Sequence, residues 1–266
     1  MIAQLNDRIL LKLSGSDTQS FLQGQLSNDI DALEEGVVQP NAYCQHQGKI
    51  IALLWVMKQG DDFYLSFPDD LKAIVVQKLT MFKMMSAVEI IDVSDKIIQL
   101  GVIDGSFEGA FRLNEQQSVA LIESVDGVEL SNESEWESAC IANNIAEVTL
   151  ATSEKFVPQL LNLDINEVGV SFTKGCYPGQ EVVARLHYLG KSKRRMRQFE
   201  CEGEVDVGDE LVVVGSKSAK ASGIVVRRVK LGAKSSFLAT VEVAYEDDKI
   251  TLNATDGIEL TRVVHG

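Results

Sequence analysis

The segment best suited to chemistry spans residues 173–185 and reads T-K-G-C-Y-P-G-Q-E-V-V-A-R. Gly175 and Gly179 bracket Cys176 and predict a tight turn. A helix is predicted to begin directly afterwards, with Glu181 in the first turn, where the helix dipole favours a carboxylate. A thiol at a helix start faces unpaired backbone N–H groups, which favour the reactive thiolate. Cys176 is therefore a candidate functional thiol, although an incidental cysteine in a glycine-rich connection fits the same local pattern.

A run of basic residues follows this segment, in a chain whose formal net charge is −14. Such a run indicates either a local anion site or a solvated linker face, and the sequence leaves both open. The run comprises Lys191, Lys193, Arg194, Arg195 and Arg197.

Composition limits the classes of function for this chain of 266 residues. A hydrophobic content of 45% is enough for a sizeable core, and no apolar run approaches the roughly 18 residues that a membrane span needs. The N-terminal residues show no signal-peptide pattern, and the four cysteines are scattered without metal-ligand spacing. We therefore expect a reduced, cytoplasmic protein without a stably bound metal. The acidic balance disfavours broad, charge-driven binding to nucleic acid.

Hydrophobic periodicity predicts an α+β region in the first part of the chain. Single helices, expected at 18–24, after Pro68 and at 133–141, interrupt strands and favour helices packed against one face of a sheet. The turn at 45–49 joins two of these strands into a hairpin. The predicted strands are 8–13, 43–44, 50–56, 63–67, 88–93, 97–103 and 118–123.

Two side chains in this region have more than one possible role. Trp136 and Cys140 share one face of the helix at 133–141, and core packing is the ordinary role of a tryptophan there. Asp164 ends the run Leu160–Leu163, where a carboxylate is costly if it is buried without a donor. It therefore lies at the surface or receives hydrogen bonds from a ligand or a backbone N–H.

The residues after Met196 predict a small β-barrel or sandwich, because short apolar runs alternate with turn residues. We place the domain boundary near 191–196. This gives a first region of residues 1–190, in two lobes of about 1–95 and 96–190, and a C-terminal β-barrel of residues 191–266.

The motif around Cys176 resembles the signature of the YgfZ-type folate-binding proteins. The matching residues are Lys174-Gly175-Cys176-Tyr177, Gly179-Gln180-Glu181, Ala184-Arg185 and Leu189-Gly190-Lys191, and upstream segments at 21–29, 43–49 and 158–164 agree in the same order. That family is similar in fold to the T-protein of the glycine cleavage system, a tetrahydrofolate-dependent aminomethyltransferase. The resemblance implies a ring of α+β lobes enclosing a folate-sized central cavity. It also implies a role in the assembly or repair of iron–sulfur clusters, including those of a radical enzyme that methylthiolates transfer RNA.

The resemblance assigns roles to individual residues. Cys176 matches the functional cysteine of the family, and Trp136 lies where a folate-contacting tryptophan is expected. Arg8 lies where a second such tryptophan can occur. Asp164 lies where T-proteins hold a carboxylate that grips the pterin ring through two parallel hydrogen bonds. The basic residues after Arg185 are then placed to attract the glutamate tail, and the surrounding motif is Lys174, Gly175, Tyr177, Gly179, Gln180, Glu181 and Arg185.

One departure from the T-proteins bears on catalysis. T-proteins carry an aspartate pair after the glycine-rich hairpin, and Ala52 and Leu53 occupy the corresponding positions here. Neither residue transfers a proton, so general acid/base chemistry at that point is lost. His46 lies on the turn and is a poor substitute. We therefore predict a protein that binds tetrahydrofolate but is not an aminomethyltransferase.

Three functions remain open from the sequence. The first is a folate-binding accessory factor whose partners are iron–sulfur enzymes or cluster-assembly proteins. The second is a folate-dependent one-carbon transferase with an altered site, which requires an acid or base in the cavity. The third is a module that binds transfer RNA directly, which the acidic composition disfavours.

Overall fold

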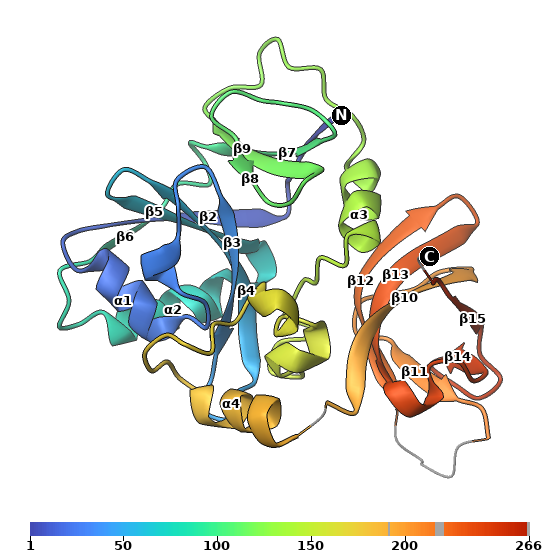
Figure 1. Ribbon diagram of the computed structural model, residues 1–266. Helices are drawn as coiled ribbons and strands as arrows, with labels where there is room; N and C mark the ends of the chain where they lie inside the picture. The colour runs from blue at the N-terminus through green and yellow to red at the C-terminus, as the bar shows by residue number, and fades with distance from the viewer. Residues whose placement is uncertain (191, 216–220, 265–266) are drawn as a thin grey trace.

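The computed structural model describes residues 1–190, 192–215 and 221–264. These residues form two antiparallel sheets and a closed barrel, with the loops and short helices of residues 143–168 lying between them (Figure 1). No helix in the described ranges is long and apolar enough to cross a membrane.

The first sheet has the strand order β3-β4-β5-β2-β6. Alternation along β2 places Leu11 and Leu13 in one core cluster with the helices α1 and α2, and Leu10 in a second cluster with Trp55 and Trp136. The sheet is therefore buried on both faces. The elements are β2 (Arg8–Ser14), α1 (Thr18–Gln25), η1 (Ile30–Ala32), β3 (Val38–Cys44), β4 (Ile50–Gln59), β5 (Asp62–Pro68), η2 (Asp69–Leu71), α2 (Lys72–Phe82) and β6 (Glu89–Asp92).

These elements confirm the predicted hairpin, the strand at 8–13 and the helix after Pro68. The expected helix end at Gly24 is corrected: helix α1 runs one residue further, to Gln25, and the φ of Gly24 lies outside the left-handed region. A glycine in that conformation does not end a helix.

The second sheet has the order β1-β7-β9-β8 and packs against the helix α3. Its first strand, β1, comes from the N-terminus and pairs with β7. This sheet therefore combines residues from both sides of position 95. Gly101 in β7 allows the close approach of α3, since a Cβ there would lie 2.3 Å from the Trp136 ring. The elements are β1 (Ile2–Gln4), β7 (Ile98–Ile103), β8 (Phe111–Arg112), β9 (Gln117–Ile122) and α3 (Glu133–Ala142).

The C-terminal part is a closed six-stranded barrel in the order β10-β13-β12-β11-β14-β15, which confirms the predicted barrel. It has its own core, which includes Phe199 and Phe237. Closure leaves no unpaired sheet edge. The elements are β10 (Arg194–Glu202), β11 (Glu210–Val213), β12 (Gly223–Leu231), β13 (Lys234–Glu242), η5 (Val243–Tyr245), β14 (Ile250–Leu252) and β15 (Glu259–Arg262).

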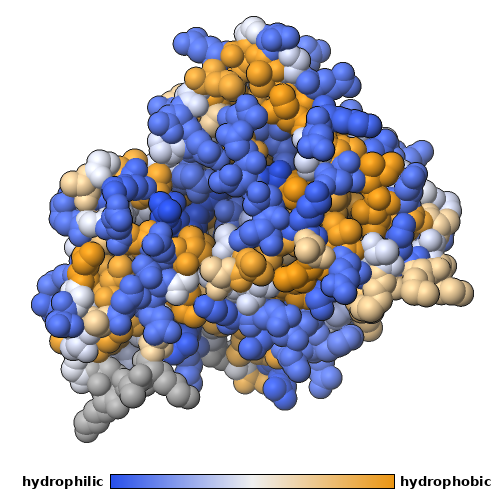
Figure 2. Space-filling model, turned by 180° about the vertical axis from the view of Figure 1, so that it is seen from behind, coloured by the Kyte–Doolittle hydropathy of each residue, from blue (hydrophilic) through white to orange (hydrophobic). Residues whose placement is uncertain are grey.

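The segment between α3 and the barrel contains η3 (Pro158–Leu161), η4 (Ile165–Glu167) and α4 (Gln180–Leu189). It runs back across the first sheet, where the backbone N–H of Ile50 donates to the carbonyl of Phe156 and that of Glu154 to the carbonyl of Ile50. Seen from behind, the surface shows hydrophobic patches separated by polar side chains (Figure 2).

Candidate ligand pocket and cysteine loop

A cavity of about 620 Å³ lies where the first sheet, the segment after α3 and the barrel meet. We call it the central pocket. Its volume falls within the range of roughly 300–1,000 Å³ that is usual for small-molecule sites. Its walls come from Leu53 and Trp55 of β4, residues 143–146, residues between 161 and 168, residues 196–198 of β10, residues 262–264, and Pro40, Leu113 and Asn114.

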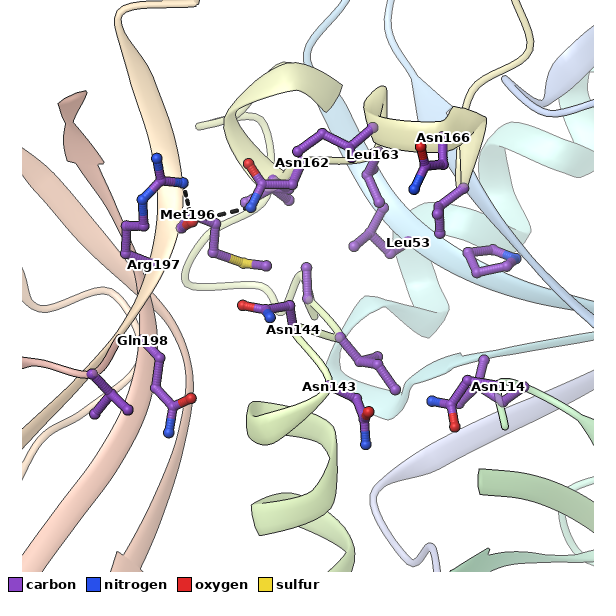
Figure 3. A pocket seen from close by; sticks show the side chains of 18 of the residues that line it. Leu53, Asn114, Asn143, Asn144, Asn162, Leu163, Asn166, Met196, Arg197 and Gln198 are labelled. Carbon is purple, nitrogen blue, oxygen red and sulfur yellow. Dashed lines mark hydrogen bonds between the residues drawn. The ribbon is translucent and has the colours of Figure 1, made fainter. Parts of the chain in front are cut away.

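Carboxamide side chains are unusually frequent around the central pocket. They come from four separate parts of the chain and surround apolar side chains such as those of Leu53 and Met196 (Figure 3). Several already have protein partners, since Nδ2 of Asn114 and of Asn143 donates to Oε1 of Gln117, and Nε2 of Gln198 to Oγ of Ser236. Oδ1 of Asn162 is buried without a partner among the described residues, so it can accept from an N–H group of a ligand. The six are Asn114, Asn143, Asn144, Asn162, Asn166 and Gln198.

Charge is scarce in this lining. Among the described residues that line the central pocket, Arg197 and Arg262 carry the only charged side chains, and none is Asp, Glu, His, Lys or Cys. Both arginines lie on the barrel side of the pocket and both contact Glu246, with Nε of Arg197 at 2.7 Å and Nη1 of Arg262 at 2.9 Å. Nη2 of Arg262 also contacts Asp247 at 2.9 Å, so both arginines are already paired with acidic side chains. Among the described residues, the pocket lining has no side chain suited to general acid/base catalysis.

The backbone of the pocket wall is strained. Asn144, Asn162 and Asn166 adopt left-handed conformations with φ of 55°, 60° and 52°. Asparagine tolerates this region better than most residues, yet such conformations persist only where the surroundings impose them. The side chain of Asn162 is fixed by donation from Nδ2 to the carbonyl of Met196 at 3.0 Å, which ties the segment after η3 to the barrel (Figure 3).

The predicted turn and helix around Cys176 are both present. Cys176 is exposed in the loop before α4, and Gly179 precedes the first helical residue with a φ of 85°. Glu181 lies in the first turn of α4, and Glu181 and Arg185 are exposed. No residue of this loop lines the central pocket, so the thiol lies outside the cavity rather than within it.

Gly179 is essential to how the loop packs on the glycine-rich hairpin. A Cβ at Gly179 would lie 2.5 Å from the carbonyl oxygen of Gln45 and 2.6 Å from Cα of Gly48. Gly48 itself has a φ of 75°. The two glycines thus let the hairpin turn and the start of α4 meet backbone to backbone.

Lys174 fixes the other side of the loop. Its Nζ donates to the carbonyl oxygens of Gln23, Leu26 and Asn28 at 2.6–2.8 Å, and lies 5.5 Å above the Tyr177 ring. Burial lowers the pKa of the Lys174 ammonium to about 8, although the charges of nearby aspartates oppose this shift. Lys174 thereby ties the cysteine loop to the end of α1, where backbone carbonyls are otherwise unpaired.

Tyr177 lies beneath this loop and is buried. Burial raises the pKa of its hydroxyl, and the neighbouring Cys44 adds to that rise. Burial likewise raises the pKa of the Cys44 thiol to about 12, so this second thiol stays protonated.

Hydrogen bonds connect the cysteine loop to the pocket wall. The backbone carbonyl of Asn28 accepts from Lys174, and its side-chain Nδ2 donates to the carbonyls of Pro40 and Val168, two residues of the wall. On the other side, Nε2 of Gln159 donates to the carbonyl of Val183 in α4 at 2.8 Å. The pocket and the cysteine loop are therefore separate, but hydrogen bonds of Asn28 and Gln159 hold the segments around both of them.

Trp136 is a core residue rather than a wall of the central pocket. Its ring is 1% exposed and packs edge-on against Trp55, with ring centroids 6.2 Å apart. Trp55 is the tryptophan that lines the pocket, and the guanidinium of Arg8 lies 3.9 Å above its ring. The sequence contained a signal for this role of Trp55, because strand alternation places it on the same face of the sheet as Leu53.

Asp164 does not face the central pocket, although Leu163 and Ile165 on either side of it do. Its carboxylate accepts two hydrogen bonds from Arg195, at 2.5 and 3.0 Å. The predicted hold on a pterin ring is therefore not supported, because the two oxygens already have a bidentate partner.

The predicted open anion patch is also corrected. Besides Arg195, Arg194 pairs with Glu242 at 2.9 Å and Arg197 with Glu246 at 2.7 Å, while Lys193 is exposed. Lys191 lies outside the described residues. Acidic partners thus neutralise most of the run, and only Arg197 of these residues lines the central pocket.

The low pKa of Lys174 gives a pH-dependent expectation. Its folded pKa of about 8 lies below its ordinary value of 10.5, so between these values the unfolded chain binds more protons than the folded one. The stabilisation that Lys174 provides should therefore rise from pH 8 to pH 10 and be lost below pH 8. Urea unfolding of the wild type and of Lys174→Met measures this effect, and the difference between their free energies of unfolding should widen as the pH rises from 8 to 10. A difference that narrows instead would mean that the three carbonyls keep the Lys174 ammonium charged.

Among the described residues, no group of three or more His, Cys, Asp and Glu side chains is arranged to hold a metal ion.

Comparison with known proteins places the chain in a family. No family model matches it. An uncharacterised protein of Haemophilus influenzae is 32% identical over 84% of this chain and 82% of its own length. The tRNA-modifying proteins YgfZ of Photobacterium profundum and Pectobacterium atrosepticum are each 28% identical over 73% of this chain and 68% of their own lengths.

A solved structure supports the same relationship. The glycine cleavage aminomethyltransferase T of Bartonella henselae superposes with a TM-score of 0.71 over 99% of this chain and 84% of its own, at 11% identity. At 11% identity, this structural likeness establishes the fold alone. Sequence relatives and fold agree: this chain belongs to the family of the tRNA-modifying proteins YgfZ and has the fold of the glycine cleavage T-protein.

Proposed function

We propose that this protein binds tetrahydrofolate in the central pocket and acts in the cytoplasm as an accessory factor for the assembly or repair of iron–sulfur clusters. Its clients would include radical enzymes that modify transfer RNA, and Cys176 would be its working thiol. The observation that carries the folate assignment is the composition of the central pocket: carboxamides and Trp55 around the cavity, and two arginines on the barrel side.

Tetrahydrofolate suits this lining part by part. Its pterin ring has N–H and C=O groups along one edge, which carboxamides can pair with through both donors and acceptors. The flat ring and the benzoyl group can pack on Trp55, Leu53 and Met196. The glutamate carboxylates can pair with Arg197 and Arg262, in place of part of the contact that these arginines make with Glu246.

An accessory role fits better than one-carbon transfer. Leu53 lines the pocket where the resemblance expects a catalytic aspartate, and the neighbouring Ala52 is buried in the core. Without an acid or base in the lining, proton transfer to or from the folate nitrogens has no protein partner. The alternative of an altered one-carbon transferase therefore lacks the side chain that it requires.

Cys176 is exposed, whereas the other three cysteines of the chain, Cys44, Cys140 and Cys201, are buried. Ligation of a cluster by Cys176 would therefore need ligands from a partner protein or a small thiol. Exchange with a partner's disulfide or thiol is the other route open to one exposed thiol. Direct binding of transfer RNA is disfavoured, because acidic side chains pair with most of the basic run.

Calorimetric titration of tetrahydrofolate into the reduced protein tests the first half of this proposal. We expect a dissociation constant on the order of micromolar and a change in Trp55 fluorescence. We also expect no transfer of a glycine-derived methylene to the folate, in contrast to a T-protein. Absence of binding would remove the folate assignment, and detectable transfer would remove the accessory role.

The variant Cys176→Ser separates the thiol from the pocket. Because the thiol is exposed and does not line the pocket, this variant should fold and bind tetrahydrofolate like the wild type. In cells that lack the native protein, it should fail to restore methylthiolation of transfer RNA. Full restoration would show that Cys176 is dispensable. Cys201→Ser, which alters a buried thiol of the barrel core, serves as the matched control.

A further inference from the structure

Arg8 places a buried cation on the face of Trp55, the tryptophan that lines the central pocket. The centre of its guanidinium lies 3.9 Å from the centre of the Trp55 ring. The Arg8 side chain is 8% exposed and Trp55 is 3% exposed, so little water screens this contact. An arginine over a tryptophan face is attracted most strongly where both groups are desolvated. The contact therefore holds the ring and also covers one of its faces.

Hydrogen bonds to two other parts of the chain fix the plane of this guanidinium. Its Nε donates to Oγ of Ser66 in β5 at 2.8 Å, and its Nη1 to the carboxylate of Glu147 at 2.5 Å. Oγ of Ser66 donates in turn to Oε1 of Gln99 in β7, whose Nε2 donates to the backbone carbonyl of Arg8. Because a guanidinium is planar and its donors are rigidly spaced, these partners leave it a single orientation on the ring.

Glu147 connects this arrangement to the wall of the central pocket. It directly follows residues 143–146, which line the pocket and include two of its carboxamides. Arg8 is not among the described residues of that lining, and it lines a second cavity of about 410 Å³ together with Glu147. The stacked pair of Arg8 and Trp55 therefore lies between the two cavities. Arg8 can act on a ligand of the central pocket through the Trp55 ring and through the wall segment.

A second buried arginine holds the same wall segment from the barrel. Arg227 of β12 is 3% exposed, and it donates to both carboxylate oxygens of Glu137, at 2.7 and 2.8 Å, and to the carbonyl of Ile145 at 3.3 Å. Among the described residues, however, Arg8 is the only cation that stacks on Trp55. Arg227 therefore offers a control of similar burial that supports the wall but not the ring.

We propose that Arg8 is a positioning residue for the ligand of the central pocket. It fixes the plane of the Trp55 ring and, through Glu147, sets the position of the wall segment 143–146 relative to that ring. The ligand is tetrahydrofolate, as in the proposed function on which this role rests, and its flat rings pack on Trp55. A ring that is held in place before the ligand arrives lowers the ordering cost of binding. The positioning is present in the unliganded protein and is measurable without folate.

Fluorine NMR of the full chain labelled with 5-fluorotryptophan tests this role, because the chain has two tryptophans and gives one signal for each. The test variant combines Arg8→Met with Glu147→Gln, which leaves no buried carboxylate without its partner. We expect the Trp55 signal to shift and broaden in the unliganded protein, and the affinity for tetrahydrofolate to fall by about tenfold. Arg8→Lys keeps the charge but not the planar group, so it should not restore the signal. An unchanged Trp55 signal in the folded variant would overturn the proposal.

The control combines Arg227→Met with Glu137→Gln. It should leave the Trp55 signal in place and shift that of Trp136, which is adjacent to Glu137 in α3. Equal shifts of the Trp55 signal in the two variants would indicate a general loss of packing and overturn the role of Arg8, as would a shifted signal with unchanged tetrahydrofolate affinity. If the wild type binds no tetrahydrofolate but the Trp55 signal shifts only in the Arg8 variants, Arg8 remains the support of the ring and the folate assignment fails instead.

Discussion

Gly179→Ala should destabilise the protein by about 3 kcal/mol or more, the largest stability loss that we expect from any single residue of the cysteine motif. Alanine at a φ of 85° is strained, and its Cβ would overlap the backbone of the hairpin turn at Gln45 and Gly48. Neither neighbour is a flexible side-chain end, so relief requires the hairpin and α4 to move apart. Urea unfolding monitored by circular dichroism measures the loss as a lower midpoint.

Gly175→Ala is the matched control from the same motif. Nothing lies within 4 Å of the position of its Cβ, and its φ lies outside the left-handed region. Its effect on stability should stay within about 0.5 kcal/mol, as is usual for an exposed site without special geometry. If both substitutions lower the free energy of unfolding by the same amount, the contact between Gly48 and Gly179 does not hold the loop in place.

Replacing both Arg197 and Arg262 by glutamine should weaken tetrahydrofolate binding by about 100-fold, or roughly tenfold for each charge-assisted pair that is lost. The physical reason is that these are the charged side chains among the described residues of the pocket lining. Calorimetry at two salt concentrations measures the change, and the salt dependence of binding should fall in the double variant.

Two controls locate the effect at the glutamate tail. Arg194→Gln removes one positive charge from the strand that carries Arg197, yet Arg194 pairs with Glu242 and does not line the pocket, so binding should be unaffected. A tetrahydropterin without the benzoylglutamate should bind the wild type and the double variant equally. Equal weakening of both ligands would mean that the arginines support the pocket rather than contact the tail.

Much of the cysteine loop was predictable from the sequence, because its determinants are local. Paired glycines, a following helix start and an acidic first turn act over a few residues, and the structure has all three. The hairpin, the helix after Pro68 and the barrel followed from hydrophobic periodicity for the same reason. The order of these motifs along the chain also sufficed to indicate the family.

The pocket could not be read in this way, because its wall draws on residues from Pro40 to Val264. Periodicity placed Trp136 on a buried helical face, but only the packing of α3 on Gly101 decided that it belongs to the core. Trp55, on a strand buried on both faces, became the pocket residue instead.

Charge pairing was decided by the tertiary structure as well. Arg195 and Asp164 are 31 residues apart, and Arg227 pairs with Glu137 across 90 residues, contacts that no local pattern reveals. A sequence shows where charges are concentrated but not which of them meet, because ion pairs depend on distances of a few ångströms between segments brought together by folding. The sequence by itself thus determined the local conformation of the motif and the alternation of the strands. The tertiary structure decided which side chains face the pocket and which charges remain available to a ligand.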